Sequence, residues 1–142
     1  MFGSSQPLKG KRVIISAGGN GIGAVMAKMF SDAGARVAIF DLDDSHFEEM
    51  MRKDYIAYAG KADASNFEQI EAFFMCAVDQ IGGLDILINN AGIAGPNALL
   101  EDITPSEWDT TITIDLNCAF YCSKLAIPYI KLNKEGGSII NI

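Results

Sequence analysis

Eight residues near the start of the chain, Ser16-Ala17-Gly18-Gly19-Asn20-Gly21-Ile22-Gly23, have the composition of a turn that holds a phosphate group. They follow a short apolar run over 13–15 and precede a helical pattern over 24–30. In a strand–turn–helix unit, glycines let the backbone bend sharply and approach a ligand. The helix start then directs free N–H groups and the positive end of its dipole at an anion. The pattern predicts a dinucleotide pyrophosphate site with the contacts Ser16, Gly18, Asn20, Gly21, Ile22 and Gly23.

An acidic side chain follows at a distance that suits the same ligand. Asp41 ends the next apolar run, 36–40, and lies 18 residues after the last glycine of the turn. A carboxylate there accepts hydrogen bonds from the adenosine ribose and repels a 2′-phosphate, which predicts NAD rather than NADP as cofactor. Leu42, the next residue, is expected in the same site. The alternative is a solvated charge at a strand end, because Asp43 and Asp44 stand beside it.

Two further motifs follow predicted strands. Ala62-Asp63 comes after the third strand, where the carboxylate either accepts from the adenine amino group or caps the helix that begins near Ser65. The segment Asn89-Asn90-Ala91-Gly92 follows the fourth strand. Its small residues suit an ordinary turn as well as a backbone that passes close to a cofactor. For Asn89, Asn90, Ala91 and Gly92 we favour the cofactor site, because ligands bind outside the carboxyl ends of such strands.

Strand and helix patterns alternate along the chain, which predicts βαβ units, a parallel sheet and right-handed crossovers. Strands are expected at 11–16, 35–41, 55–60, 84–89 and 137–142, and helices at 21–33, 45–53, 65–82 and 104–132. Capping boxes are expected at Ser45/Glu48, Ser65/Glu68 and Thr104/Glu107, and glycine stops at Gly34 and Gly82-Gly83. The fold class is α/β: a Rossmann-type doubly wound parallel sheet with helices on both faces.

Bulk properties limit the classes of function. The 142 residues suffice for a single domain, and a formal net charge of -7 argues against nucleic acid or an anionic membrane as partner. No apolar run is long enough to span a bilayer, and the polar start of the chain predicts a cytoplasmic protein. Three cysteines, Cys76, Cys118 and Cys122, are interpreted as small apolar residues. No metal site is expected, and His46 is interpreted as solvated.

These motifs together resemble the short-chain dehydrogenase/reductase family. The resemblance rests on Leu8-x-Gly10-Lys11, the glycine turn, Asp41, Ala62-Asp63, the NNAG segment 89–92, Trp108 and Gly136-Gly137-Ser138-Ile139-Ile140-Asn141-Ile142, in that order and spacing. It implies that Asp41 selects NAD, that Asp63 contacts adenine, and that Asn90 and Gly92 line the nicotinamide-side ribose. The first glycine of the family turn is Ala17 here. A methyl group there crowds the turn only if the backbone needs a positive φ, and Gly18 and Gly19 offer relief.

Two further departures concern the chemistry. The resemblance implies a catalytic asparagine seven residues after Trp108, where Asp115 stands, and we expect Asp115 to take the water-holding role imperfectly. The alternative is a local adaptation without mechanistic meaning. The family also uses a serine after the fifth strand and a Tyr-x-x-x-Lys pair for acid/base work. None of the four tyrosines has a lysine four residues later, and Ser138 stands at the wrong end of its strand.

We therefore interpret residues 1–142 as one NAD(P)-binding domain that is incomplete at its C-terminal end and inactive alone. The resemblance implies a full-length NAD-dependent oxidoreductase that transfers a hydride between nicotinamide and a secondary alcohol or ketone. It also implies a homo-oligomer, a tetramer or dimer, with contacts through the helix at 104–132. The alternatives are a catalytically silent dinucleotide-binding module and an NADP-dependent reductase. The substrate stays open.

Overall fold

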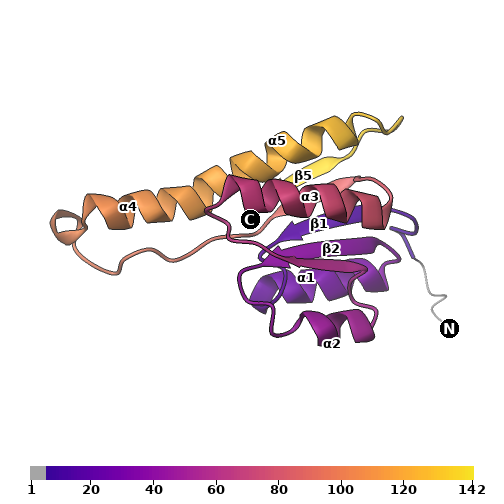
Figure 1. Cartoon of the computed structure of the whole chain (residues 1–142), viewed down its shortest axis with the longest axis horizontal. Helices are drawn as coiled ribbons and strands as arrows, with labels where there is room; N and C mark the ends of the chain where they lie inside the picture. Colours follow the sequence, from indigo (N-terminus) through magenta and orange to yellow (C-terminus); the bar gives the residue numbers. More distant parts are fainter. Residues whose placement is uncertain (1–5) are drawn as a thin grey trace.

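The structure, a computed structural model, describes residues 6–142 and consists of one five-stranded parallel sheet with helices on both faces (Figure 1). The strands are β1 (Arg12–Ser16), β2 (Arg36–Asp41), β3 (Tyr58–Lys61), β4 (Ile86–Asn89) and β5 (Ser138–Asn141), in the spatial order β3-β2-β1-β4-β5. The order reverses between β1 and β4. The predicted fold class is confirmed, and the point of reversal places the carboxyl ends of β1 and β4 side by side.

Two apolar cores enclose the sheet, which explains why its central strands read as continuous apolar runs. The helices α1 (Gly21–Asp32) and α2 (Phe47–Arg52) cover one face, and α3 (Phe67–Ile81) and α5 (Cys118–Ile130) cover the other (Figure 1). Along β1, Val13 and Ile15 face the first core and Ile14 faces the second. At the edge of the sheet opposite β3, all four residues of β5 are exposed.

The third and fourth predicted helices differ most from expectation. The helix expected at 104–132 is divided into α4 (Pro105–Ile112), a π-helical turn η2 (Thr113–Asn117) and α5, and a short 3₁₀ helix, η1 (Leu100–Asp102), precedes it. The capping box at Thr104 and Glu107 is confirmed. The helix expected at 65–82 begins only at Phe67, because the side chain of Asn66 accepts the N–H of Gln69. The capping box predicted at Ser65 is therefore wrong.

Two other local predictions need correction. The capping box at Ser45 is absent: the Ser45 N–H donates to Asp43 Oδ1, and α2 begins after His46, which makes no side-chain cap. The third strand begins at Tyr58 rather than at residue 55, because the chain first turns through Asp54, which has φ +57°. The glycine stops are confirmed. Gly82 is a left-handed C-cap of α3, and Gly34 adopts φ +93° just after α1.

Candidate functional site

The turn between β1 and α1 is shaped by close backbone contacts that only glycine permits. A Cβ atom on Gly18 would lie 2.5 Å from Ile39 Cγ2, and one on Gly23 would lie 2.1 Å from the carbonyl oxygen of Ala17. The N–H of Gly18 donates to the Phe40 carbonyl at 3.0 Å, so the turn folds back over the end of β2. The sequence-predicted glycines are therefore needed for the shape of the turn itself.

Ala17 adopts φ +50°, in the left-handed region that favours glycine. The turn thus requires the positive φ under which the methyl group was expected to matter. Gly18 and Gly19 do not take over this conformation, because neither has a φ in that region. Ala17 is held by hydrogen bonds from the loop after β4. Asn90 Nδ2 donates to the carbonyl oxygens of Ser16 and Ala17 at 3.1 and 3.0 Å.

Ser16 joins the glycine turn to the segment after β4. Its side chain is fully buried, and its Oγ accepts the N–H groups of both Asn90 and Ala91 at 2.9 Å. The Ser16 hydroxyl is also 3.5 Å from the carbonyl of Ile88, to which it donates. One buried hydroxyl thus satisfies two backbone amides of half-buried residues, so the ends of β1 and β4 are held together.

The start of α1 has the features of an anion site. The side chain of Asn20 caps the helix by accepting the N–H of Gly21 at 2.7 Å. A first helical turn leaves further N–H groups without intrahelical partners, and in α1 these belong to Ile22 and Gly23. No acidic side chain stands in the first turn of α1, whereas α2, α3 and α4 each carry one or more there. This helix end can therefore accept a phosphate without repulsion from an acidic side chain of its own first turn.

Asp41 is not a merely solvated charge. Its Oδ2 accepts the N–H of Gly19 at 2.9 Å, and its Oδ1 accepts the N–H of Asp43 at 3.2 Å. The carboxylate thereby fixes the middle of the glycine turn against the end of β2. A carboxylate has lone pairs left after two such bonds, so it can still accept a hydroxyl group.

The carboxyl ends of the strands surround a cavity of about 160 Å³, which we call the site cavity. Among the predicted site residues, Asp41, Leu42, Ala62, Asp63, Ala91 and Gly92 line it. Ala17, Phe40, Ala64, Ile93 and Ile114 complete the lining. The sequence motifs did not indicate the last four of these as site residues. Phe40, Ala64 and Ile93 each adjoin a predicted motif, which was the available signal, whereas Ile114 comes from the unexpected π-helical turn.

Asp63 lies at the site cavity but does not cap α3, since Asn66 does. Its Oδ1 accepts both the N–H and the hydroxyl of Ser65, at 2.8 and 2.7 Å. Both bonds lower the pKa of the Asp63 carboxyl below its usual value, and the bond from the backbone N–H has the larger effect. The capping alternative is therefore wrong, and an adenine contact stays a prediction.

Asn89 and Asn90 point to different neighbours. The Asn90 amide reaches the glycine turn, whereas Asn89 Nδ2 donates to Ser123 Oγ at 3.1 Å and to Asn141 Oδ1 at 2.8 Å. Asn89 is buried, and among residues 6–142 its Oδ1 finds no hydrogen-bond partner. Its side chain therefore ties β4 to β5 and α5. Its role beside a cofactor stays a prediction.

Asp115 stands inside the π-helical turn η2 and reaches across to the NNAG loop. Its Oδ1 accepts the N–H of Ile93 at 2.8 Å, and a Cβ atom on Gly92 would lie 3.5 Å from the same oxygen. The carboxylate thus holds the loop that lines the site cavity. π-helical turns inside α-helices occur frequently at functional sites. A catalytic role for Asp115 remains a prediction.

The comparisons with known proteins agree with this arrangement. The family model described as short chain dehydrogenase matches residues 11–142. The chain belongs to this family. It is similar to D-beta-hydroxybutyrate dehydrogenase of Cupriavidus necator (36% identity over 143 residues; 95% of this chain, 53% of that protein). It is also similar to D-xylose 1-dehydrogenase of Caulobacter vibrioides (35% identity over 138 residues; 94% of this chain, 53% of that protein).

Solved structures are similar to this chain in fold as well as in sequence. A short chain dehydrogenase from Mycobacterium smegmatis matches with a TM-score of 0.86 and 30% identity, over 96% of this chain and 58% of that one. Levodione reductase matches with a TM-score of 0.86 and 25% identity, over 94% and 54% of the two chains. The present chain thus spans about half the length of the relatives it matches.

Within residues 6–142, none of the helices combines the length and the apolar character that a bilayer crossing requires. The same part of the chain contains no cluster of three or more His, Cys, Asp or Glu side chains arranged to hold a metal ion. Most of the polar N-terminal stretch, on which the cytoplasmic prediction rests, lies outside the described residues.

Proposed function

We propose that the whole protein is an NAD-dependent oxidoreductase that transfers a hydride between nicotinamide and a secondary alcohol or ketone. Residues 1–142 supply the dinucleotide-binding part. The observation that carries the proposal is the Asp41 carboxylate, fixed to Gly19 N–H at the site cavity beside an α-helix start without acidic side chains. Bound NAD would supply the hydride acceptor, and the protein would supply its position.

The choice of NAD over NADP rests on charge. An anionic Asp41 beside the ribose position favours two hydroxyl groups and repels a 2′-phosphate. Its bond to Gly19 N–H also uses a backbone donor that would otherwise be available to that phosphate. The names of the relatives, a hydroxybutyrate dehydrogenase and a xylose dehydrogenase, support an alcohol or ketone as substrate.

The acid/base part is expected outside residues 1–142, because none of the tyrosines here precedes a lysine at the family spacing. The second candidate, a catalytically silent dinucleotide-binding module, is favoured by that same observation. A homo-oligomer is proposed through α4, η2 and α5, on which Trp108, Leu116 and Phe120, respectively, are exposed. A cytoplasmic location stays a prediction.

The test is steady-state turnover by the full-length protein with a panel of secondary alcohols, followed through NADH absorbance. We expect turnover with NAD, and we expect Asp41→Asn to lower the ratio of kcat/KM with NAD to that with NADP at least tenfold. Asp43→Asn, two residues further along the loop after β2, is the matched control and should leave the ratio unchanged. Dinucleotide binding without turnover on any substrate would support the silent module. If the NAD-to-NADP ratio of kcat/KM were the same in Asp41→Asn as in Asp43→Asn, the role of Asp41 would be refuted.

A further inference from the structure

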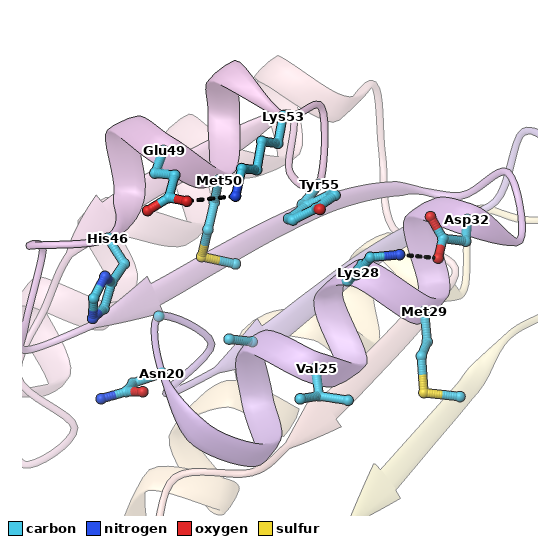
Figure 2. A pocket seen from close by; sticks show the side chains of 12 residues that line it. Asn20, Val25, Lys28, Met29, Asp32, His46, Glu49, Met50, Lys53 and Tyr55 are labelled. Atoms are coloured by element: carbon cyan, nitrogen blue, oxygen red, sulfur yellow. Dashed lines mark hydrogen bonds and ion pairs between the residues drawn. The ribbon is translucent and has the colours of Figure 1, made fainter.

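The dipeptide Asn20-Gly21, where the glycine turn meets α1, joins a side-chain amide to a residue without a side chain. It is the one place in the chain where glycine follows asparagine. Both residues are exposed, and a Cβ atom on Gly21 would have no neighbouring atom within 4 Å among residues 6–142. Figure 2 shows the Asn20 side chain at the start of α1. Water therefore reaches the Asn20 amide and the backbone nitrogen that follows it.

The backbone nitrogen of Gly21 lies beside the side-chain amide of Asn20. Its N–H donates to Asn20 Oδ1 at 2.7 Å, so the nitrogen is already near Cγ, the carbon that carries this oxygen. Bond formation between the nitrogen and Cγ needs a rotation of Asn20, which has ψ 172°, and breaks this hydrogen bond. The bond from the Ala24 N–H to the Asn20 carbonyl, 3.1 Å long, resists that rotation. Both bonds belong to the first turn of α1, and helix ends fray, so the rotation needs only a local opening.

The start of α1 favours a negative charge on these two residues. The positive end of the helix dipole stabilises anions in the first turn, and α1 has no acidic side chain there. Loss of a proton turns the Gly21 nitrogen into a nucleophile, and the same positive end assists that loss. Because Gly21 has no Cβ atom, its nitrogen is open to the side chain of Asn20. The dipeptide therefore has the local conditions for attack of its backbone on its own side chain.

We propose that Asn20 deamidates spontaneously in the folded protein. The Gly21 nitrogen gives up its proton and bonds to Asn20 Cγ, the bond from Cγ to Nδ2 breaks, and ammonia leaves with a proton. Water then opens the resulting succinimide ring. Opening at Cγ leaves an aspartate at position 20, and opening at the backbone carbonyl leaves an isoaspartate, whose backbone is one carbon longer. No group is oxidised or reduced, and water is the co-reactant.

Both products carry a carboxylate at the helix start to which the proposed function assigns the dinucleotide pyrophosphate. This consequence rests on the proposed function, whereas the chemical step does not. Repulsion between like charges at a protein surface is large enough to lower affinity at least tenfold. The longer backbone of the isoaspartate also displaces the N–H groups of Ile22 and Gly23. Deamidated molecules would therefore lose dinucleotide binding while they keep the rest of the fold.

The test is peptide mapping by mass spectrometry of the full-length protein, incubated in warm neutral buffer without dinucleotide. Asn97, which is exposed in the loop after β4 and followed by Ala98, is the matched control and needs no variant. We expect aspartate and isoaspartate to accumulate at position 20 at least tenfold faster than at position 97. Gly21→Ala adds a Cβ atom beside the attacking nitrogen and should slow the reaction to the Asn97 rate. Equal rates at the two asparagines, or conversion at position 20 only in urea, would overturn the proposal.

A pair of variants tests the consequence by calorimetric titration with NAD. Serine caps a helix about as well as asparagine or aspartate but carries no charge. Asn20→Asp should therefore bind NAD at least tenfold more weakly than Asn20→Ser, with similar thermal unfolding. Equal affinity of the two variants would overturn the predicted loss of binding. Absence of NAD binding by the unmodified protein would refute the proposed function, and the mass data would still decide whether Asn20 deamidates.

Discussion

Replacing Ala17 with glycine is expected to stabilise the protein, although glycine normally destabilises. Ala17 is held at φ +50°, where a residue with a Cβ costs about 1–2 kcal/mol relative to glycine. Glycine makes the unfolded chain more flexible, which costs about 0.4–1 kcal/mol. The half-buried methyl group contributes roughly 0.4 kcal/mol that Ala17→Gly would lose. The net expectation is a gain of about 0.5 kcal/mol in the free energy of unfolding.

Equilibrium urea denaturation measures this difference, with two matched controls in the same protein. Asp54, at φ +57°, is the other described residue besides the glycines with a positive φ, so Asp54→Gly should stabilise as well. Ala27 is fully buried in the middle of α1, where a glycine loses helix propensity and a buried methyl group. Ala27→Gly should therefore destabilise by about 2 kcal/mol.

The decisive result is whether Ala17→Gly behaves like Asp54→Gly or like Ala27→Gly. If Ala17→Gly destabilises the protein as Ala27→Gly does, while Asp54→Gly stabilises it, the glycine turn does not hold Ala17 in a strained conformation. The account of how Asn90 and Ser16 fix this turn would then be wrong.

Three further perturbations follow from the contacts. Thr104→Ala should cost about 1 kcal/mol, because it removes the N-cap of α4. Arg12→Met should cost roughly 3 kcal/mol at neutral pH, since it leaves the buried Asp85 carboxylate without its partner. The Arg12 hydrogen bond lowers the pKa of Asp85 in the folded state, so the pair stabilises fully above the unfolded pKa of the carboxyl and less as pH falls through the folded pKa. Asp115→Asn should keep the bond to Ile93 N–H and stability within about 0.5 kcal/mol, while it alters the pH–rate profile.

Each of these expectations has a distinct contrary outcome. Denaturation that is unaffected by Thr104→Ala would show that α4 does not depend on its cap. An Arg12→Met loss of the same size at pH 3 and pH 7 would show that ion pairing with Asp85 is not its cause. An unchanged pH–rate profile in Asp115→Asn would leave the aspartate as a local adaptation without mechanistic meaning.

The alternation of elements and the place of the glycine turn between β1 and α1 could be predicted because they depend on local patterns. Apolar runs, a cap at Thr104 and glycines at Gly34 and Gly82 act within a few residues of where they stand. The same locality explains the failures. Ser45 matches a capping box, but its N–H donates to Asp43 Oδ1 instead, and α2 begins only at Phe47.

The π-helical turn η2 could not be predicted, because its sequence Thr-Ile-Asp-Leu-Asn contains neither proline nor glycine. Its clearest long-range contact is the bond of Asp115 to Ile93, which are 22 residues apart. The link between Ser16 and the loop after β4 spans 74 and 75 residues and depends on strand pairing. The groove of about 360 Å³ between α1 and α2 (Figure 2) likewise requires two helices to be placed side by side, which no single motif specifies.

Calorimetric titration of the full-length protein with NAD and with NADP tests the central claim most directly. We predict that NAD binds at least tenfold more tightly than NADP, because the Asp41 carboxylate would lie beside the ribose and already accepts the N–H of Gly19. Tighter or equal binding of NADP, or no binding of either dinucleotide, would contradict it.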